Sequence, residues 1–316
     1  MSWLHIVNIV ILAIVQGMAE LLPVSSSAHV IVTAKLLGLD PSTPEMTLLI
    51  VMLHTGTMFA VILYFWRAWK ASIFASREIF KQQMIRIVAA TALTAVVSGP
   101  LSLGIERAAD RFGWFVDDAG RHVAKAQAKP TSRVDSNAKA KPKAEVEMLF
   151  RNLGIVAGGL AAAGVLILIA GWAERAGPRN RPIGIREAAW IGAVQGLCLP
   201  FRGFSRSGAT ISTGLLLGGL KARVEEFSFA LAVVLTPAVI GREVWRLVKH
   251  QHDAGNSGVT WSLFAPSVLG MVCAFLAGLL ALRWLSRWLE AGRWYFFGIY
   301  CLAAASIVFA LHCRGY

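Results

Sequence analysis

Two short polar segments, each set between apolar runs, hold residue types that are suited to phosphate chemistry. The first runs from Gln16 to His29 and contains one carboxylate, Glu20, followed by three consecutive serines. Gln16 and Glu20 are four residues apart, so on a helix they share one face. A carboxylate inside an apolar segment is costly and is typical of a functional site, although it could instead pair with a buried base elsewhere.

The serines and the histidine add reactive groups to this first segment. A serine hydroxyl can act as a nucleophile, and a histidine can take or give a proton near neutral pH. Serines at the start of a helix also leave backbone N–H groups free to bind an anion, or they can merely cap that helix. A carboxylate, three hydroxyls and an imidazole so close together predict a reactive site.

The second polar segment, residues 200–210, is basic. It carries Arg202 and Arg206, and no acidic residue lies between Glu187 and Glu225 to neutralise them. The guanidinium fork of arginine matches phosphate oxygens, and the start of a helix is electropositive. Two glycines that allow a ligand to approach the backbone and three hydroxyl residues complete the segment: Gly203, Gly208, Ser205, Ser207 and Thr210. The segment therefore predicts a site for a dense anion, unless the arginines extend to the membrane surface instead.

Together the two segments predict one centre that acts on a phosphate. The arginines would bind phosphate oxygens, and Glu20 with Gln16 could hold a divalent cation, Mg²⁺ or Ca²⁺, through oxygen ligands. A serine or the histidine would then attack phosphorus or activate water, with charge developing near Arg206. Because the segments lie between apolar runs, the substrate is expected to come from the lipid phase, as a lipid phosphate ester or anhydride.

Composition fixes the class of protein that must position these segments. The chain has 316 residues, of which 56% are hydrophobic and only 16% charged. A soluble domain, a disordered tail or a secreted disulfide scaffold would need a larger share of polar residues, so the sequence predicts an integral membrane protein. The net charge of +13 arises from bases in short runs between apolar stretches. This pattern orients a membrane protein and does not indicate a nucleic-acid partner.

The apolar stretches predict six full membrane crossings. About 20 apolar residues are needed per helix, and six ranges reach that length: 45–66, 85–105, 152–172, 227–248, 263–285 and 294–312. Residues 3–39 and 187–220 instead form short apolar runs interrupted by the two polar segments. We predict that both are re-entrant helix–break–helix hairpins, whose irregular backbone must be buried in protein or line a cavity.

The two hairpins also predict an inverted repeat. Gln16-Gly17 recurs as Gln195-Gly196, and each hairpin is followed by three full spans. Three crossings reverse the direction of entry, so the second hairpin must enter from the opposite face, with the site near the middle of the membrane. The expected fold is therefore an all-α polytopic membrane protein. Its first repeat covers residues 1–172, including an extracytoplasmic loop at 106–150, and its second repeat covers 173–316.

The positive-inside rule predicts the orientation of these repeats. The segments on one side carry most of the bases, and that side is expected to be cytoplasmic, which places both termini outside. Those bases are Arg67, Lys70, Arg77, Lys81, Arg175, Arg179, Arg181, Arg186, Lys221, Arg223, Arg287 and Arg293. The spacing of Gly154 and Gly158 permits close helix packing, either within one chain or in a homodimer.

These residues resemble a known family, the undecaprenyl-diphosphate phosphatases of the bacitracin-resistance protein type. Four motifs carry the resemblance: Gln16-x-x-x-Glu20, Pro-Val-Ser-Ser-Ser-Ala-His at 23–29, Gly-Phe-Ser-Arg-Ser-Gly-Ala-Thr at 203–210 and Glu-Phe-Ser-Phe-Ala-Leu-Ala-Val at 226–233. The resemblance implies a metal-dependent hydrolase of the bacterial inner membrane that converts undecaprenyl diphosphate to undecaprenyl phosphate and inorganic phosphate. This reaction recycles the peptidoglycan carrier lipid and confers bacitracin resistance. The active site is expected to open to the extracytoplasmic side.

The resemblance also implies roles for individual residues. Glu20, Ser26, His29 and Arg206 would be catalytic, with Ser26 as the nucleophile, although Ser27 and His29 remain alternatives. The metal would be held by Gln16 and Glu20, and the phosphate-binding set would be Ser25, Ser27, Arg202, Ser205, Ser207, Gly208 and Thr210. Two departures from the family pattern matter: Gln16 is uncharged, and Arg202 stands where the family has a proline before the glycine.

Two questions stay open at the level of the sequence. His54 lies early in the first full span and could approach the site. A transporter of polyprenyl-phosphate lipids is the alternative function, because inverted repeats and broken helices also build carriers.

Overall fold

The chain folds into helices alone over the residues that can be described. The computed structural model describes residues 3–39, 44–112, 153–175, 181–201, 203–253 and 261–314. These ranges contain ten helices and, apart from one isolated bridge between Arg181 and Gly219, no β-structure. The helices are α1 (Trp3–Leu21), α2 (Ser26–Leu36), α3 (Pro44–Ser72), α4 (Arg77–Phe112), α7 (Leu153–Arg175), α8 (Ile185–Cys198), α9 (Arg206–Leu216), α10 (Lys221–Asp253), α11 (Trp261–Glu290) and α12 (Tyr295–Cys313). The predicted all-α class is confirmed.

Five of these helices are long and apolar enough to cross a membrane: α3, α4, α7, α11 and α12. The chain is therefore a multi-pass membrane protein, as its composition predicts. The sixth predicted span, residues 227–248, lies within α10, a helix of 33 residues. The predicted loop at 106–150 begins too early, because α4 remains helical as far as Phe112. The rest of that loop lies outside the described residues.

Both polar segments interrupt helices, as the sequence predicts. α1 ends at Leu21, and α2 begins at Ser26 after a turn that contains Pro23. Ser25 has a positive φ of 66°, a left-handed conformation that no helix can continue through. The second break follows α8, and there Ser205 caps α9 by accepting a hydrogen bond from the backbone N–H of Gly208.

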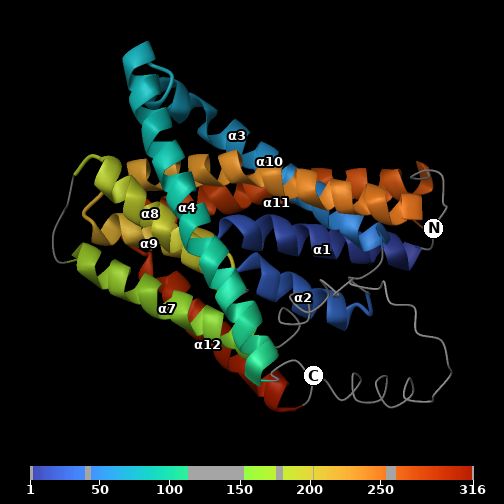
Figure 1. Ribbon diagram of the computed structural model, residues 1–316. Coiled ribbons are helices and arrows are strands. Elements are labelled where there is room, and N and C mark those ends of the chain that lie inside the picture. The colour runs from blue at the N-terminus through green and yellow to red at the C-terminus, as the bar shows by residue number, and fades with distance from the viewer. Residues whose placement is uncertain are drawn as a thin grey trace, which may run out of the picture.

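The two broken pairs face each other across the middle of the molecule. In Figure 1, α1 and α2 extend toward one end and α8 and α9 toward the other, with both breaks near the centre. α2 and α9 have 11 residues each, which gives a length of about 16 Å and is far less than a hydrocarbon core of about 30 Å. Neither half-helix can cross the membrane alone.

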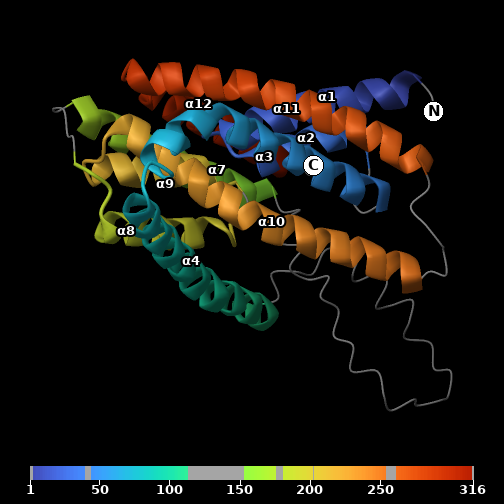
Figure 2. The ribbon, with the colours of Figure 1, turned by 90° about the horizontal axis from the view of Figure 1, so that it is seen from above.

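The two halves of the chain are interlocked. α1 packs against α11 and α3 also packs against α11, while α4 packs against α8 and α7 against α12. Figure 2 shows α11 lying along α1, with α4 beside α8. Each of these contacts joins a helix from before residue 176 to one from after residue 184. The helices of the two predicted repeats therefore pack against each other.

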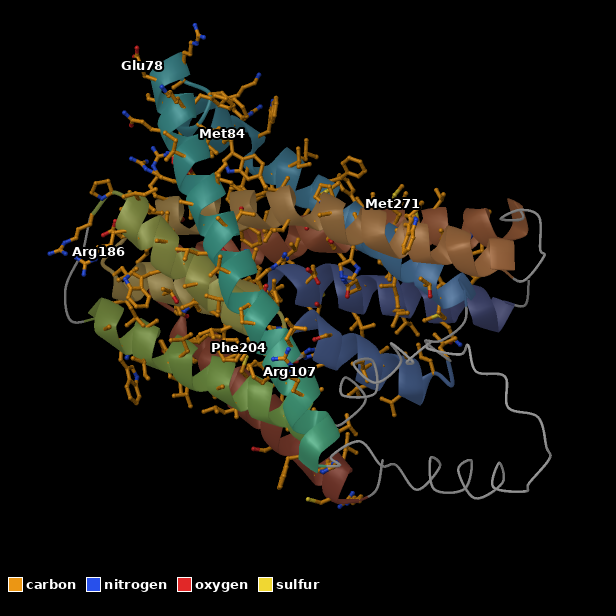
Figure 3. The ribbon with its side chains drawn as sticks, in the orientation of Figure 1. Glu78, Met84, Arg107, Arg186, Phe204 and Met271 are labelled. Atoms are coloured by element: carbon orange, nitrogen blue, oxygen red, sulfur yellow. The ribbon has the colours of Figure 1, made fainter. Side chains whose placement is uncertain are left out.

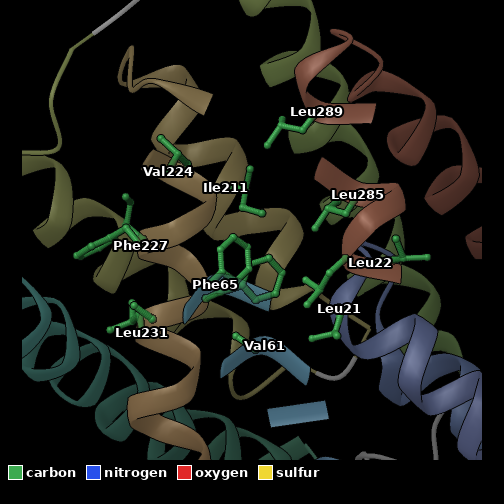
Figure 4. Packing of buried hydrophobic residues seen from close by; sticks show 14 of the residues in the cluster. Leu21, Leu22, Val61, Phe65, Ile211, Val224, Phe227, Leu231, Leu285 and Leu289 are labelled. Carbon is green, nitrogen blue, oxygen red and sulfur yellow. The ribbon is translucent and has the colours of Figure 1, made fainter. Parts of the chain in front are cut away.

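An apolar core supports the tips of both hairpins. Leu21 and Leu22 at the end of α1 face Ile211 of α9, Phe65 of α3 and Leu285 of α11 in the cluster drawn in Figure 4. Close packing of this kind stabilises helix association in a membrane through van der Waals contact. The core thereby holds the two breaks at a fixed separation.

Two glycines allow the broken helices to approach their partners closely. A Cβ atom at Gly17 would lie 2.6 Å from the carbonyl oxygen of Ala274 in α11, and one at Gly196 would lie 2.7 Å from that of Thr94 in α4. Both distances are shorter than van der Waals contact. These equivalent glycines, which the repeated Gln-Gly pair contains, each seat a hairpin against a helix of the other half.

We expect Gly17→Ala to destabilise the protein by about 1–3 kcal/mol, because the added methyl group must push α1 away from α11. The thermal unfolding midpoint in detergent measures this effect. The matched control is Gly104→Ala in α4, where a Cβ would meet no described atom within 4 Å. Alanine favours helices over glycine, so the control should be neutral or slightly stabilising. Equal midpoints for both variants would show that the α1–α11 contact is not tight.

Candidate active site

Glu20 lies at the centre of a cluster that joins both breaks. It occupies the last turn of α1, and its Oε1 atom accepts a hydrogen bond from the Arg206 guanidinium at 3.0 Å. Arg206 is the first residue of α9, so a carboxylate from the first hairpin meets an arginine from the second. The sequence separation is 186 residues. The structure thus places the two predicted segments in one site.

Ser26 is the hydroxyl residue closest to this carboxylate. Its Oγ donates a hydrogen bond of 2.5 Å to the Oε2 atom of Glu20. Ser26 is also the first residue of α2, where backbone N–H groups are not used within the helix. The arrangement pairs a nucleophilic oxygen with a proton acceptor and places both at an electropositive helix start.

Gln16 and His54 complete the surroundings of Glu20. The Nε2 group of Gln16 lies 3.2 Å from Glu20 Oε2 and 3.3 Å from His54 Nε2. His54 Nδ1 lies 2.8 Å from the carbonyl oxygen of Ile50, so the Nδ1–H group donates there and Nε2 accepts from Gln16. His54 Nε2 is 3.7 Å from Glu20. The sequence left the position of His54 open, and the structure brings it to the site from α3.

The other serine of the first break connects the hairpins. Ser27 Oγ accepts a hydrogen bond from the backbone N–H of Gly203 at 3.4 Å and lies 3.3 Å from Ser25 Oγ. It has no described contact with Glu20. Ser26 and Ser27 therefore differ in surroundings: one faces the carboxylate and the other the second break.

The hydroxyl groups of the second break bind protein atoms. Ser205 Oγ caps α9, Ser207 Oγ donates to the carbonyl oxygen of Leu22 at 3.2 Å, and Thr210 Oγ1 lies 2.6 Å from Ser228 Oγ. All three side chains are buried. These hydrogen bonds hold the second break against the rest of the protein. That Ser205, Ser207, Thr210 and Gly208 bind phosphate stays a prediction. Arg202 lies outside the described residues.

His29 contacts Tyr300, a residue that the sequence did not single out, and has no described contact with Glu20. Its Nε2 atom lies 2.6 Å from the hydroxyl of Tyr300, and the two rings are stacked with centroids 5.7 Å apart. Its Nδ1 atom lies 2.8 Å from the carbonyl oxygen of Ser25. The sequence does not mark Tyr300 as a site residue, because it lies 271 residues from His29 in an apolar helix without a polar motif. The predicted acid–base role of His29 is not tested by this geometry.

The site is partly shielded from its surroundings. The side chain of Glu20 is 15% exposed and that of Arg206 is 25% exposed. Reduced solvation strengthens the attraction between their charges relative to water. The exposed portion of each leaves a route for a ligand to reach them.

The donor atoms at the site fit a divalent cation only in part. Among the described residues there is no group of three or more His, Cys, Asp or Glu side chains that could hold a metal ion. Glu20 is the one carboxylate, and it already contacts Arg206 and Ser26. Mg²⁺ is often bound by one or two carboxylates together with substrate phosphates. The residues therefore fit a cation shared with a phosphate ligand rather than a cage made by the protein.

Comparison with known proteins identifies the family of the chain. The sequence model of the bacitracin resistance protein BacA family matches residues 9–116 and 139–307. A protein of Acinetobacter baylyi named undecaprenyl-diphosphatase 2 is 50% identical over 312 residues, which cover 98% of each chain. An undecaprenyl-diphosphatase of Renibacterium salmoninarum is 31% identical over 98% of this chain and 96% of its own. The chain belongs to the bacitracin resistance protein BacA family.

Proposed function

We propose that this protein is an integral membrane phosphatase that hydrolyses undecaprenyl diphosphate to undecaprenyl phosphate and inorganic phosphate. Its relatives are named for this activity, and the similarity spans nearly the whole chain. The observation that carries the proposal is the Glu20 carboxylate, which contacts Ser26 on one oxygen and Arg206 on the other. The reaction returns the peptidoglycan carrier lipid to use and confers resistance to bacitracin.

In the first step Ser26 Oγ forms a bond to the terminal phosphorus, and the bond between that phosphorus and the bridging oxygen breaks. The proton of Ser26 passes to Glu20, which lies 2.5 Å from Oγ. The leaving undecaprenyl phosphate keeps the electron pair of the bridging oxygen. Arg206 turns from Glu20 to the phosphoryl oxygens, where charge develops, and the first backbone N–H groups of α2 and α9 add to this stabilisation.

In the second step water hydrolyses the phosphoserine. The departing lipid phosphate takes the proton from Glu20, so the carboxylate is again ionised and can accept a proton from the attacking water. The bond between phosphorus and Ser26 Oγ breaks, and Oγ recovers that proton as inorganic phosphate leaves. Ser26 is favoured over Ser27 as nucleophile because Ser27 contacts Gly203 and Ser25 instead of the carboxylate.

A divalent cation, Mg²⁺ or Ca²⁺, is part of this proposal. Glu20 and the side-chain oxygen of Gln16 would be the ligands that the protein supplies, and the diphosphate would supply the others. Such an ion would neutralise phosphate charge. Ser25, Ser27 and the hydroxyl residues of the second break would then orient the headgroup.

We expect Gln16→Glu to lower the cation concentration needed for half-maximal activity by about tenfold or more, since a second carboxylate would face the ion. A titration of Mg²⁺ and Ca²⁺ after chelation, together with direct measurement of cation binding, gives the shift. Gln195→Glu at the equivalent position of the second hairpin is a poor control because Gln195 is fully buried. Gln82→Glu on the exposed surface of α4 is suitable. An unchanged cation dependence in Gln16→Glu would remove Gln16 from the ligand set.

We also propose a detailed membrane topology. Six full spans, with α10 as the sixth, and two re-entrant hairpins would form an inverted repeat of residues 1–172 and 173–316. The opposed directions of the hairpins in Figure 1 support it. The distribution of bases supports a cytoplasmic location for the α3–α4 corner and an inner-membrane protein whose site opens to the outside. A homodimer is compatible with the open surface at Gly158, where a Cβ would meet no described atom within 4 Å.

Release of inorganic phosphate by the purified protein from a polyprenyl diphosphate tests the central proposal. Transbilayer movement of a fluorescent polyprenyl phosphate in vesicles, measured in parallel, tests the alternative. The second assay is needed because transporters are also built from broken helices that meet near the middle of the membrane. Phosphate release that needs Glu20 would support the phosphatase, whereas lipid movement without phosphate release would favour a transporter.

A further inference from the structure

A shallow, open groove runs along the N-terminal half of α4, and all of its lining residues belong to that helix. It spans about 590 Å³, and its lining includes Arg77, Lys81, Met84, Ile85 and Val88. Figure 3 shows Glu78 in the first turn of α4, at the corner where α3 and α4 meet and project from the molecule, and Met84 further along α4.

The lining residues form one stripe along the helix, which is basic at its start and apolar further on. They recur at spacings of three and four, which places them on one face. The two bases, Arg77 and Lys81, occupy the first turns, and the lining from Met84 onward is apolar. From Arg77 to Ala89 the stripe extends about 18 Å along the helix axis. This is close to the depth of one leaflet, half of a core of about 30 Å.

Aromatic side chains place the basic end of the groove at the membrane surface. Phe74 stacks on Phe80 with ring centroids 5.6 Å apart and lies 6.1 Å from Trp66, and all three are exposed. Lys70 lies over the Trp66 ring at 5.4 Å. Exposed aromatics with an adjacent lysine are typical of the boundary between hydrocarbon and headgroups.

The segment from the end of α3 to the first turns of α4 carries a net positive charge, and two of its bases are exposed and have no acidic partner among the described residues. Between residues 67 and 86 there are five bases, Arg67, Lys70, Arg77, Lys81 and Arg86, and one acid, Glu78. Arg77 and Lys81 are both exposed, and no carboxylate of a described residue lies within 4 Å of either. The opposite face of α4 packs against α8, where Gly192 lies on Ala90. Met84 packs partly against the apolar core, but Ile85 and Val88 are exposed, so most of the groove is not the surface that holds α4 in the fold.

We propose that this groove binds an anionic phospholipid, with its phosphate between Arg77 and Lys81 and one acyl chain along Met84, Ile85 and Val88. The two bases match an anionic headgroup, and the apolar stripe matches the chain beneath it. A second copy of the protein would have to cover the unpaired bases with acidic groups. The corresponding surface of another copy carries bases instead, so charge complementarity favours the lipid.

The test is lipid binding by the intact protein in detergent. Native mass spectrometry would count bound phosphatidylglycerol and phosphatidylcholine for the wild type and for the double variant Arg77→Gln/Lys81→Gln. We expect phosphatidylglycerol to bind in preference, and the double variant to bind it about 30-fold more weakly at low ionic strength. Phosphatidylcholine binding should be the same in both proteins.

The matched control removes the same charge at another exposed site, with Arg287→Gln/Arg293→Gln. It should retain phosphatidylglycerol as the wild type does. The phosphate-releasing activity and the unfolding midpoint of both double variants verify folding, because none of the four bases contacts the Glu20 cluster. If both double variants lost phosphatidylglycerol binding equally, the binding would depend on net charge alone. If the wild type bound the two lipids equally, it would not recognise the headgroup. Either result overturns the proposal.

Discussion

Arg206→Ala is expected to lower kcat/KM for a polyprenyl diphosphate by at least about 10³-fold. Arg206 is the described arginine that contacts the Glu20 cluster, and it lies at the start of α9. Without it, the phosphoryl charge that develops in the transition state loses a charged donor in surroundings of low dielectric constant. Steady-state phosphate release with purified protein measures the loss.

Two further variants separate this role from general stability. Arg206→Lys keeps the charge but loses the planar fork, so a smaller loss of about 10- to 100-fold is expected. Arg223→Ala breaks an exposed pair with Glu226 and should leave activity near that of the wild type. Arg206→Ala also leaves Glu20 without its partner, so the unfolding midpoint must be compared with that of Glu20→Gln/Arg206→Ala. Near-normal turnover of a folded Arg206→Ala protein would exclude the assigned role.

Ser26→Ala is expected to abolish measurable turnover, a loss of about 10³-fold or more, because it removes the proposed nucleophile. Ser27→Ala is the matched control from the same break. It loses only a hydrogen bond from Gly203 and a contact with Ser25, so a loss of about tenfold or less is expected. Brief incubation with substrate labelled on the terminal phosphate, followed by acid quenching, detects the covalent phosphoserine in wild type and Ser27→Ala.

The reverse pattern would identify the other serine. If Ser27→Ala were inactive and Ser26→Ala retained both turnover and labelling, Ser27 would be the nucleophile and the 2.5 Å contact of Ser26 with Glu20 would be structural. Turnover without any acid-stable label on serine would point to direct attack by water or to His29. A phosphohistidine is labile in acid, so quenching in base distinguishes these outcomes.

The meeting of Glu20 with Arg206 could be predicted from the sequence. Glu20 is an acid without a nearby base in its apolar region, Arg206 lies in a region without acids, and charges in a membrane are stable only when they find a partner or line a polar cavity. The breaks could be predicted because each combines a proline with several polar residues inside an apolar stretch; a proline alone is not enough, since Pro100 lies inside α4. Helix boundaries were less predictable, as α4 shows by extending to Phe112 through a mixed, weakly apolar sequence.

Contacts between distant helices could not be predicted. Tyr300 is one of three exposed aromatic residues in α12, and only the packing of α12 brings it 2.6 Å from His29. The hydroxyl groups of Ser207 and Thr210 illustrate the same limit. Their position beside Arg206 predicts phosphate ligands, but it does not predict that they also join α9 to Leu22 and Ser228. Residue type indicates what a side chain can bind, but the neighbours decide what it does bind.

The interlocked helices have a consequence for biosynthesis. α11, the helix that Gly17 of α1 contacts, is translated more than two hundred residues after Gly17. Until α11 has been made, α1 can pack only against α2 and α3 among these neighbours, and until α9 has been made Glu20 lacks Arg206. Insertion of the first spans into the bilayer must therefore precede assembly of the hydrolytic centre, and a chain truncated after its first three spans would contain Glu20 without its arginine partner. Such nascent intermediates are natural substrates for membrane chaperones and quality-control proteases.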